Sequence, residues 1–491
     1  MANIKQEESI FQEVVSHAKE YGFVFPSSEI YDGLAAVYDY GQNGVELKNN
    51  LKNCWWKSMT QLNDNIVGID AAIFMHPKTW VASGHVAGFA DPMIDNKDSK
   101  KRYRADQLLE KHAEELIAQG QQQKAAEVLS AMNKLLTDND LKGVQELIIA
   151  EKIKCPLSGT ANWTDVRQFN LMFSTQMGAM AEEANEIYLR PETAQGIFVN
   201  FLNVQKTGRM KIPFGIAQIG KAFRNEIVAR QFIFRMREFE QMEMQFFVRP
   251  KTEMEWYQHW KETRLKWHKA LGIPSEKLQF HDHEKLAHYA NAAVDIEFQF
   301  PFGFKEIEGI HSRTDFDLGN HQELSKKKQQ YYDNEINQSY VPYVVETSVG
   351  ADRLFLAHLC NAYTKTQGTD AEGNTKERLF LKFHPAIAPI KAAVFPLTKK
   401  DGLPEKATKI FDDLKTDFRV AYEQQDSIGK RYTRQDLLGT PFCITVDHQS
   451  LEDDTVTLRH RDSVEQERLP IAALKDKIEH ATSMKRIFEQ L

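Results

Sequence analysis

Residues 215–248, GIAQIGKAFRNEIVARQFIFRMREFEQMEMQFFV, alternate apolar and polar side chains in a pattern that predicts two β-strands joined by a loop. Successive side chains of a strand point to opposite faces, so each predicted strand has an apolar face and a polar face. The apolar face carries Ala217, Ile219, Phe223, Met242, Met244 and Phe246. The other face carries Gln218, Arg224, Glu226, Arg237, Phe239, Gln241 and Glu243. Such strands form an antiparallel sheet with one buried face and one charged, aromatic face.

The charged face suits a purine triphosphate. An aromatic ring can stack on the base, and guanidinium groups bind phosphate through paired hydrogen bonds. The alternative is a half-solvated hairpin whose charges simply face water, and this stretch alone leaves that alternative open.

Two further stretches contain carboxylates at positions where function and structure are both plausible. LRPETAQGIFVNF at 189–201 predicts a strand-to-helix turn with Glu192 at the helix start, where a carboxylate either binds a ligand or caps the helix. FGFKEIEGIHSRTDFDL at 302–318 predicts a strand in which Glu306 and Glu308 share a face. Paired carboxylates beside a triphosphate are candidate Mg²⁺ ligands, and a solvated acidic face is the alternative.

VPYVVETSVGADRLFLAHL at 341–359 predicts a buried strand, a turn at Gly350 and a helix. Arg353 falls in the first turn of that helix, where the helix dipole already favours an anion. Its position after a glycine turn favours a phosphate-binding role over that of an ordinary surface charge.

The chain of 491 residues is long enough for two or more domains. Residues 105–152 predict two or three short polar helices that resemble an insertion. Prolines near 383–397 mark a boundary, after which strands alternate with helices, as in a small α/β domain. This last part carries basic residues that form a candidate nucleic-acid patch: Lys430, Arg431, Arg434, Arg459 and Arg461.

Charge and cysteine content restrict the class of protein. The formal net charge of −7 argues against a generically basic nucleic-acid coat, so any such binding must come from local patches. The four cysteines are far apart and form no CxxC pair, which fits a reducing cytosol and gives no zinc motif. No apolar signal core or membrane-spanning run is evident, so a soluble cytoplasmic protein is expected.

Several of these stretches, taken in order, resemble class II aminoacyl-tRNA synthetases, and specifically the homodimeric glycyl-tRNA synthetases. FRNE followed by FRMREFEQME is similar to motif 2 of that class, and ETSVGADR is similar to motif 3. RADQLL, LRPETAQG and GIHSRTDFDL resemble further blocks of the glycine enzymes. The resemblance implies an α+β fold: an antiparallel-sheet catalytic domain over 1–380 with a helical insertion at about 97–152, and an α/β anticodon-binding domain over 381–491.

The resemblance also implies ATP as a substrate, with Mg²⁺. Arg224 would hold the α-phosphate and Arg353 the γ-phosphate, as the two catalytic residues, while Glu306 would bind Mg²⁺. Phe239 would stack on the adenine, and Glu226 would face its amino group. The implied ATP-binding set is Arg224, Asn225, Glu226, Phe234, Arg235, Met236, Arg237, Glu238, Phe239, Glu306, Ile307, Gly350, Ala351, Asp352 and Arg353.

A glycine pocket must bind an ammonium group and exclude a methyl group, which acidic residues in a filled pocket can do. The implied glycine-binding set is Arg104, Glu192, Phe239, Glu240, Gln241, Met242, Glu243, Glu346, Thr347, Ser348, Val349 and Gly350. Related enzymes often carry cysteine pairs near position 155, whereas only Cys155 is present here, so no zinc is predicted.

The implied activity is glycine–tRNA ligation by a cytoplasmic homodimer, with glycine, ATP and tRNA-Gly as partners and no membrane. One alternative is a catalytically inactive paralogue with a regulatory or accessory role, but Arg224, Glu226, Glu306 and Arg353 are all present. Another is a ligase of this fold that acts on a small acceptor, against which the complete C-terminal part argues. The nearest enzymatic rival is a class II enzyme for a different amino acid, which the three glutamates of the implied pocket disfavour.

Overall fold

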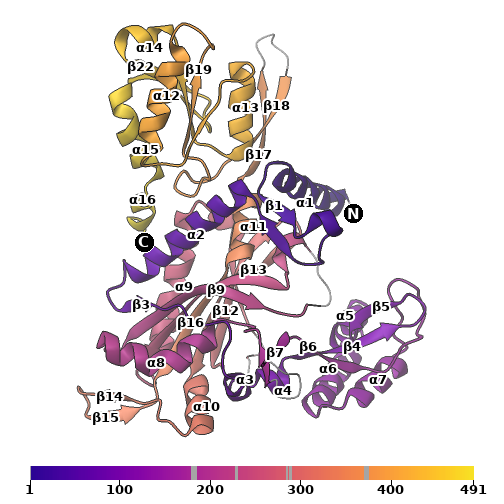
Figure 1. The fold of residues 1–491 in the computed structure, drawn as a ribbon. Helices are drawn as coiled ribbons and strands as arrows, with labels where there is room; N and C mark the ends of the chain where they lie inside the picture. The colour runs from indigo at the N-terminus through magenta and orange to yellow at the C-terminus, as the bar shows by residue number, and fades with distance from the viewer. Residues whose placement is uncertain (1, 179–184, 227–230, 284–285, 287–289, 370–374) are drawn as a thin grey trace. The chain divides into compact units, whose positions relative to one another are not determined.

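A seven-stranded sheet forms the centre of the larger of two compact units, which comprises Met1–Met75 and Glu192–Leu491. The computed structural model describes residues 2–178, 185–226, 231–283, 286, 290–369 and 375–491. Neighbouring strands of the sheet are antiparallel, except that the edge strand β3 is parallel to β9 (Figure 1). In spatial order the strands are β11 (Leu278–Asp282), β12 (Ala292–Phe300), β13 (Gly303–Thr314), β16 (Tyr343–Gly350), β10 (Glu238–Val248), β9 (Phe214–Phe223) and β3 (Ile66–Gly68).

The hairpin predicted from residues 215–248 is formed by β9 and β10, which pair from Phe223 opposite Glu238 to Phe214 opposite Phe247. The predicted apolar face is confirmed, since Met242, Met244 and Phe246 are buried in the main hydrophobic core. The helices that contribute most side chains to the same core are α2 (Gln42–Thr60), α9 (Glu253–Ala270) and α11 (Ala351–Ala362).

The opposite face of the sheet is only partly covered by helix. The helix α8 (Ala194–Gly208) packs Phe201 against Phe214 and Phe247, in a second core cluster that also includes Leu318 of α10 (Phe316–Ser325). This cluster buries one end of the face. The other end keeps polar side chains of β10 and β16, and the candidate site lies there.

Short elements complete this part of the larger unit. The N-terminal helix α1 and the strands β1 and β2 precede α2. One further hairpin, β14–β15, lies between β13 and β16 along the chain, and another, β17–β18, follows α11. Their bounds are α1 Ala2–Glu20, β1 Val24–Pro26, β2 Tyr38–Tyr40, β14 Tyr331–Asp333, β15 Gln338–Tyr340, β17 Tyr363–Thr369 and β18 Thr375–Leu381.

The smaller unit, His76–Pro191, has a hydrophobic core of its own. Three helices occupy the stretch where two or three were predicted, and they pack on a three-stranded sheet of order β5-β4-β6. The bounds are α3 Pro77–Ala82, α4 His85–Gly88, β4 Ala90–Asn96, β5 Lys101–Arg104, α5 Ala105–Ala118, α6 Gln122–Thr137, α7 Leu141–Ala150, β6 Arg167–Asn170, β7 Ser174–Met177 and β8 Asn185–Tyr188. The predicted insertion boundaries of about 97–152 stay a prediction, as does the catalytic-domain range.

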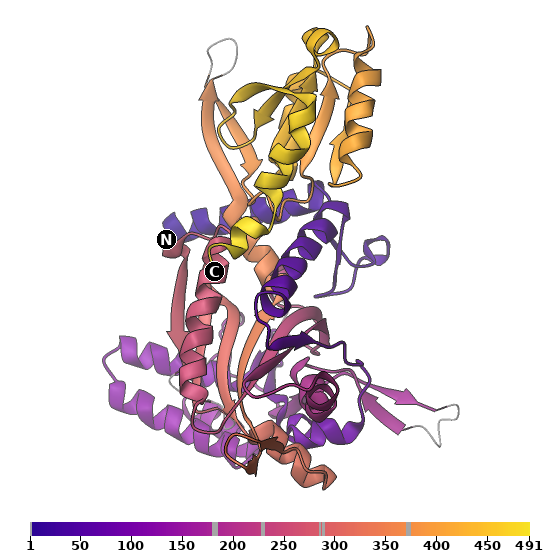
Figure 2. The same ribbon diagram turned by 90° about the vertical axis from the view of Figure 1, so that its left-hand side faces the viewer.

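The C-terminal part has the predicted alternation of strands and helices, around a sheet of order β20-β19-β21-β22-β23. The helix α15, in yellow in Figure 2, runs beside this sheet and buries Leu474 and Ile478 in its core. The bounds are β19 Ala392–Pro396, α12 Leu403–Leu414, β20 Val420–Tyr422, α13 Ile428–Leu438, β21 Phe442–Val446, α14 His448–Asp453, β22 Thr455–His460, β23 Gln466–Pro470, α15 Leu474–Thr482 and α16 Lys485–Phe488.

The predicted α+β fold, an antiparallel-sheet core with an inserted helical part and a C-terminal α/β part, is confirmed. Within the described residues, every helix is too short or too polar to cross a lipid bilayer.

Candidate active site

The uncovered end of the sheet contains a cavity of about 130 Å³ between β9, β10, β13 and the β16–α11 turn. Most of the side chains predicted from the charged hairpin face and from the Gly350 turn meet there. The lining residues are Arg224, Glu226, Ile233, Phe234, Arg235, Met236, Phe239, Glu240, Gln241, Glu306, Ser348, Gly350, Asp352 and Arg353. A neighbouring cavity of about 410 Å³ shares Phe234, Arg235, Glu306 and Arg353 with it.

Arginine and phenylalanine side chains are paired on the walls of this cavity. The Arg224 guanidinium carbon lies 5.3 Å from the centre of the Phe239 ring, and that of Arg353 lies 4.4 Å from the centre of Phe234. Arg353 also donates to a Glu306 carboxylate oxygen at 2.7 Å. Desolvation by the surrounding protein acts to raise the pKa of the partly exposed Glu306, but the Arg353 charge and hydrogen bond lower that pKa overall, so Glu306 is ionised at neutral pH. These walls therefore combine aromatic rings with the guanidinium groups of Arg224 and Arg353 and the carboxylate of Glu306.

The prediction that Glu306 and Glu308 share a strand face is wrong. The register between β12 and β13 shifts, because Ile296 pairs with Glu308 whereas the next residue, Glu297, pairs with Glu306. The extra residue, Ile307, makes a β-bulge, and a bulge reverses the alternation of side chains beyond it. Glu306 faces the cavity, whereas Glu308 lies on the opposite side, buried against α9.

An acidic cluster lies beside the cavity at the start of α8. Glu243 is buried and accepts a hydrogen bond from the Thr193 hydroxyl. Burial, together with the negative charges of Glu346 and Glu192, raises the pKa of Glu243 to about 8. Glu346 is also buried, but Arg313 and His311 outweigh that burial and lower its pKa to about 2. At neutral pH the buried Glu243 is thus protonated. A cation bound beside Glu243 would lower its pKa and favour the ionised carboxylate.

Several residues of the predicted sets contribute backbone or support rather than a side chain in the cavity. Their side chains lie in the main hydrophobic core: Met242, Ile307, Val349 and Ala351. Asp352 accepts hydrogen bonds from Tyr40, Lys48 and the Glu240 backbone, which fixes the start of α11 against α2 and β10. Thr347 is buried within β16.

The remaining predicted residues surround the mouth of the site or lie elsewhere. Arg237 donates to the backbone oxygens of Glu226 and Ala35, and Glu238 pairs with Lys221 at 2.7 Å. Asn225 follows Arg224 directly after β9. Arg104 lies in the His76–Pro191 unit, where it pairs with Asp91 at 3.0 Å and with Asp106 at 2.5 Å.

Sequence reasoning missed several residues that hold the site together. Lys48 pairs with Asp352 at 2.6 Å and with Glu240 at 3.2 Å, and it comes from α2, about three hundred positions from its partner along the chain. Arg313 pairs with Glu346 at 3.1 Å and with Asp317 at 2.8 Å. Arg313 lies near the end of β13 and Asp317 in the first turn of α10, so their spacing of four residues is not that of a helical pair and gave no signal in the sequence.

The candidate nucleic-acid patch of the C-terminal part is largely wrong, because three of its five residues are buried structural groups. Arg431 donates to the backbone oxygens of Pro396, Leu397 and Glu423, while Arg461 donates to those of Gly439 and Phe383. Arg459 makes a buried bidentate pair with Asp436. Lys430 stays exposed, and Arg434 is partly exposed but paired with Glu423 and Asp426.

Comparison with known families agrees with this arrangement. A family model described as "tRNA synthetase class II core domain (G, H, P, S and T)" matches residues 173–362, which include β9, β10, β13 and β16. The model "Glycyl-tRNA synthetase insertion domain 1" matches 91–127 and 117–171, and "Anticodon binding domain" matches 391–480. The fold is that of the class II aminoacyl-tRNA synthetases.

Curated relatives narrow the class to one family. The glycine–tRNA ligase of Chlorobaculum tepidum is 56% identical over 458 residues, covering 93% of this chain and 96% of that protein. The glycine–tRNA ligase of Macrococcus caseolyticus is 53% identical, over 95% of this chain and 98% of its own length. That of Staphylococcus aureus strain Newman is 52% identical, over 94% and 96%. The chain belongs to the glycine–tRNA ligase family.

Proposed function

We propose that the chain is a glycine–tRNA ligase, which activates glycine with ATP and transfers it to the 3′ end of tRNA-Gly. The observation that carries the proposal is one sheet face that joins the Arg224–Phe239 and Arg353–Glu306 pairs to the buried Glu243 cluster. These are the groups needed for a nucleoside triphosphate and for an ammonium group, side by side. Family membership supports the same activity.

In the first step the glycine carboxylate attacks the α-phosphorus of ATP, a mixed anhydride forms and pyrophosphate leaves. Arg224 would stabilise the negative charge that develops on the α-phosphate oxygens. Such electrostatic stabilisation of the transition state is usually the largest single contribution to the rate acceleration. Phe239, beside Arg224, would stack on the adenine, with Glu226 toward its amino group. Arg235 and Arg237 would lie near the triphosphate. Arg353 would bind the γ-phosphate and keep ATP bent, so that the pyrophosphate leaves in line with the attack on the α-phosphorus.

Glu306 is the candidate Mg²⁺ ligand. It is ionised, its side chain is 45% exposed, and Asp295 and Glu297 line the same 410 Å³ cavity, so oxygen donors of the kind Mg²⁺ prefers are available. Mg²⁺ bound there would neutralise charge on the phosphate oxygens. Arg353 pairs with Glu306 at 2.7 Å, so a γ-phosphate that bound Arg353 would compete for this pair and release Glu306 for the metal.

In the second step a terminal ribose hydroxyl of the tRNA attacks the carbonyl carbon of the adenylate and AMP leaves. The C-terminal part, which matches an anticodon-binding family, would hold the far end of the tRNA. The glycine ammonium group would be bound by Glu192, Glu243 and Glu346, together with Ser348. Close packing around them would exclude the methyl group of alanine.

Amino-acid-dependent ATP–pyrophosphate exchange, measured over a panel of amino acids, tests this activity directly. We expect exchange with glycine alone, followed by charging of tRNA-Gly. Exchange with a different amino acid would transfer the assignment to another class II specificity. No exchange with any amino acid, from protein that is folded by circular dichroism, would favour the regulatory paralogue instead.

We expect glycine binding to release a proton near pH 7. Glu243 is protonated in the free site because its pKa is about 8, and an ammonium group beside it favours the carboxylate. Apparent glycine affinity should therefore rise with pH up to about 8, by at most about tenfold per pH unit, and then level off. The KM for glycine in the exchange reaction, measured from pH 6 to pH 9, checks this. Glu243→Gln should flatten the profile; an unchanged profile in that variant would contradict the role of Glu243.

We also propose a homodimer. Ile30, Tyr31 and Leu34 are 86%, 79% and 58% exposed on the segment between β1 and β2, and neighbouring exposed apolar side chains of this size are typical of an interface. Light scattering should give a mass near twice 56.6 kDa, and Tyr31→Asp should weaken the association. A monomer at micromolar concentration would refute the dimer.

A cytoplasmic location is proposed on the four cysteines. Cys54, Cys155, Cys360 and Cys443 all lie in described parts of the chain and are free thiols, as is usual in a reducing compartment. Cell fractionation that recovered the protein outside the cytoplasm would overturn this location.

We also propose the boundary between the catalytic and anticodon-binding domains, at 380/381.

A further inference from the structure

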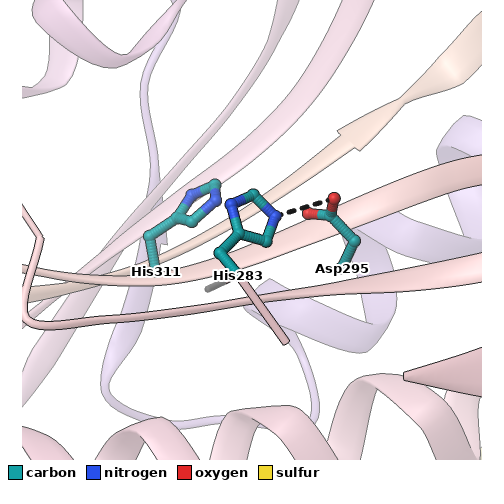
Figure 3. Close-up of side chains that lie close together, drawn as sticks. All are labelled: His283, Asp295 and His311. Atoms are coloured by element: carbon teal, nitrogen blue, oxygen red, sulfur yellow. Dashed lines mark ion pairs between the residues drawn. The ribbon is translucent and has the colours of Figure 1, made fainter. Parts of the chain in front are cut away.

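Three potential metal ligands come together on neighbouring strands at the edge of the central sheet. His283 directly follows β11, Asp295 lies on β12 and His311 on β13. The backbone amide of His283 donates to the oxygen of Ala293, which pairs with His311 in the sheet, so His283 and His311 flank Ala293 at one level. Asp295 lies two residues further along β12, on the same face of that strand as Ala293. Figure 3 shows His283 between His311 and Asp295, with its ring directed at the carboxylate.

A glycine makes room for this group. Asp295 pairs across the sheet with Gly309, and a Cβ atom at Gly309 would lie only 2.8 Å from the His311 ring. Because no side chain is present there, the His311 ring can lie over Gly309 toward the Asp295 carboxylate. The backbone thus allows the two ligands to approach across the strand pair.

One ligand atom from each residue can be chosen so that all three lie within 4.8 Å of one another. The His283 Nε2 atom is 2.9 Å from the Asp295 carboxylate. Ligands 2.0–2.2 Å from a tetrahedral ion are about 3.3 Å apart, so a small side-chain movement closes the site. His283, whose side chain is 33% exposed, has the freedom to make that movement.

A supporting hydrogen bond already orients one of the imidazoles. His311 Nδ1 lies 2.9 Å from a Glu346 oxygen, and Arg313 holds the same carboxylate. A histidine whose second ring nitrogen contacts a carboxylate is the usual arrangement of a metal-bound histidine, because the carboxylate fixes the ring and increases its basicity. The Nε2 atom of His311 is thereby left as the ligand atom.

We propose that His283, Asp295 and His311 form a binding site for one divalent transition-metal ion of the zinc type. Two imidazoles and one carboxylate suit Zn²⁺, Co²⁺ or Ni²⁺, whereas Mg²⁺ prefers oxygen donors throughout. Asp295 is also one of the oxygen donors near the Mg²⁺ ligand proposed at Glu306, and it is the two imidazoles that give this site its preference for a different metal. Three protein ligands leave one coordination position of the ion unfilled, and His283 and Asp295 both line the open 410 Å³ cavity. Metal binding at these residues does not depend on the proposed ligase activity.

Cobalt spectroscopy of the full chain tests the site. The parent protein and all variants in this titration carry Cys155→Ser, because the Cys155 thiol would compete for the metal. Burial acts to raise the pKa of that thiol, but hydrogen bonds from Ser158, Ser99 and Tyr103 outweigh burial and lower the pKa to about 6. After removal of metals with a chelator, Co²⁺ is titrated and the visible absorption of low-symmetry cobalt is followed. We expect one Co²⁺ per chain, displaced by one equivalent of Zn²⁺.

Two variants and a matched control assign the ligands. His283→Ala and His311→Gln should each weaken cobalt binding by at least about 100-fold, since loss of an outer-shell partner alone costs 10–100-fold. His281→Ala should bind normally, because His281 lines the same cavity and lies next to His283 but is outside the cluster. His283 is on the surface, so its variant remains informative if His311→Gln proves unstable. Absence of stoichiometric binding in the parent protein, or binding that survives both variants, would refute the site.

Discussion

Arg224→Ala is expected to lose glycine-dependent ATP–pyrophosphate exchange by at least about 10²–10³-fold, the loss typical when one fixed group that stabilises transition-state charge is removed. The guanidinium lies beside Phe239 and lines the cavity where the phosphates are proposed to bind. Because the negative charge on the α-phosphate grows only as the glycine carboxylate attacks, the loss should fall mainly on kcat rather than on the KM for ATP.

Steady-state exchange at saturating glycine, with ATP varied, separates these two constants. Lys269→Ala is the matched control, because Lys269 is an exposed cation near the end of α9, a helix that packs into the core on the other face of the sheet. That control should keep its activity within about twofold, as expected of a surface charge. Activity of Arg224→Ala within threefold of the parent protein would remove Arg224 from the mechanism.

The hairpin at the centre of the site was predictable because its information is local. Strand periodicity depends on neighbouring residues alone, and it assigned Met242 and Met244 to the core and Glu243 to the polar face correctly. The Gly350 turn was predictable for the same reason, since a glycine between a buried strand and an amphipathic helix is typical of a tight connection.

The failures concern partners that are distant in sequence. A strict two-residue period cannot anticipate the bulge at Ile307, which depends on pairing with β12, and it therefore placed Glu308 on the wrong face. The C-terminal arginines have the same origin of error. The sequence predicted a basic surface that included Arg431, Arg459 and Arg461. In the folded chain these side chains are instead bound to backbone oxygens and to Asp436, which are distant from them in the sequence.

The bulge also connects the site to the core. On one side of it Glu306 faces the cavity and pairs with Arg353; on the other Glu308 accepts from Arg264 Nε at 2.6 Å and contacts His268 Nε2 at 2.7 Å. Glu308, Arg264 and His268 are all buried and form an ionic cluster. The bulge thus separates a carboxylate that lines the cavity from one that belongs to a buried ionic cluster on the other side of the sheet.

Arg264→Met should lower the free energy of unfolding by about 3–5 kcal/mol, because it leaves the buried Glu308 carboxylate without its charge partner. Arg264 also lies over the Trp267 ring, with 4.4 Å between its guanidinium carbon and the ring centre, so packing adds to the loss. Urea unfolding followed by tryptophan fluorescence measures the effect where it arises, since Trp260 and Trp267 are buried in the same core and report on it even if the C-terminal part unfolds separately.

The double variant Arg264→Met/Glu308→Met distinguishes charge from volume. With both charges removed, the remaining destabilisation should be smaller than that of Arg264→Met alone, because an unpaired buried charge costs more than an apolar replacement of the pair. The contribution of Glu308 to the free energy of unfolding should depend on pH. Burial acts to raise the pKa of Glu308, but Arg264 and His268 lower that pKa overall. The stabilisation by Glu308 is therefore complete above the ordinary glutamate pKa and is lost as the pH falls through the lowered pKa. A double variant less stable than the single one would show that the cluster contributes through packing and not through paired charge.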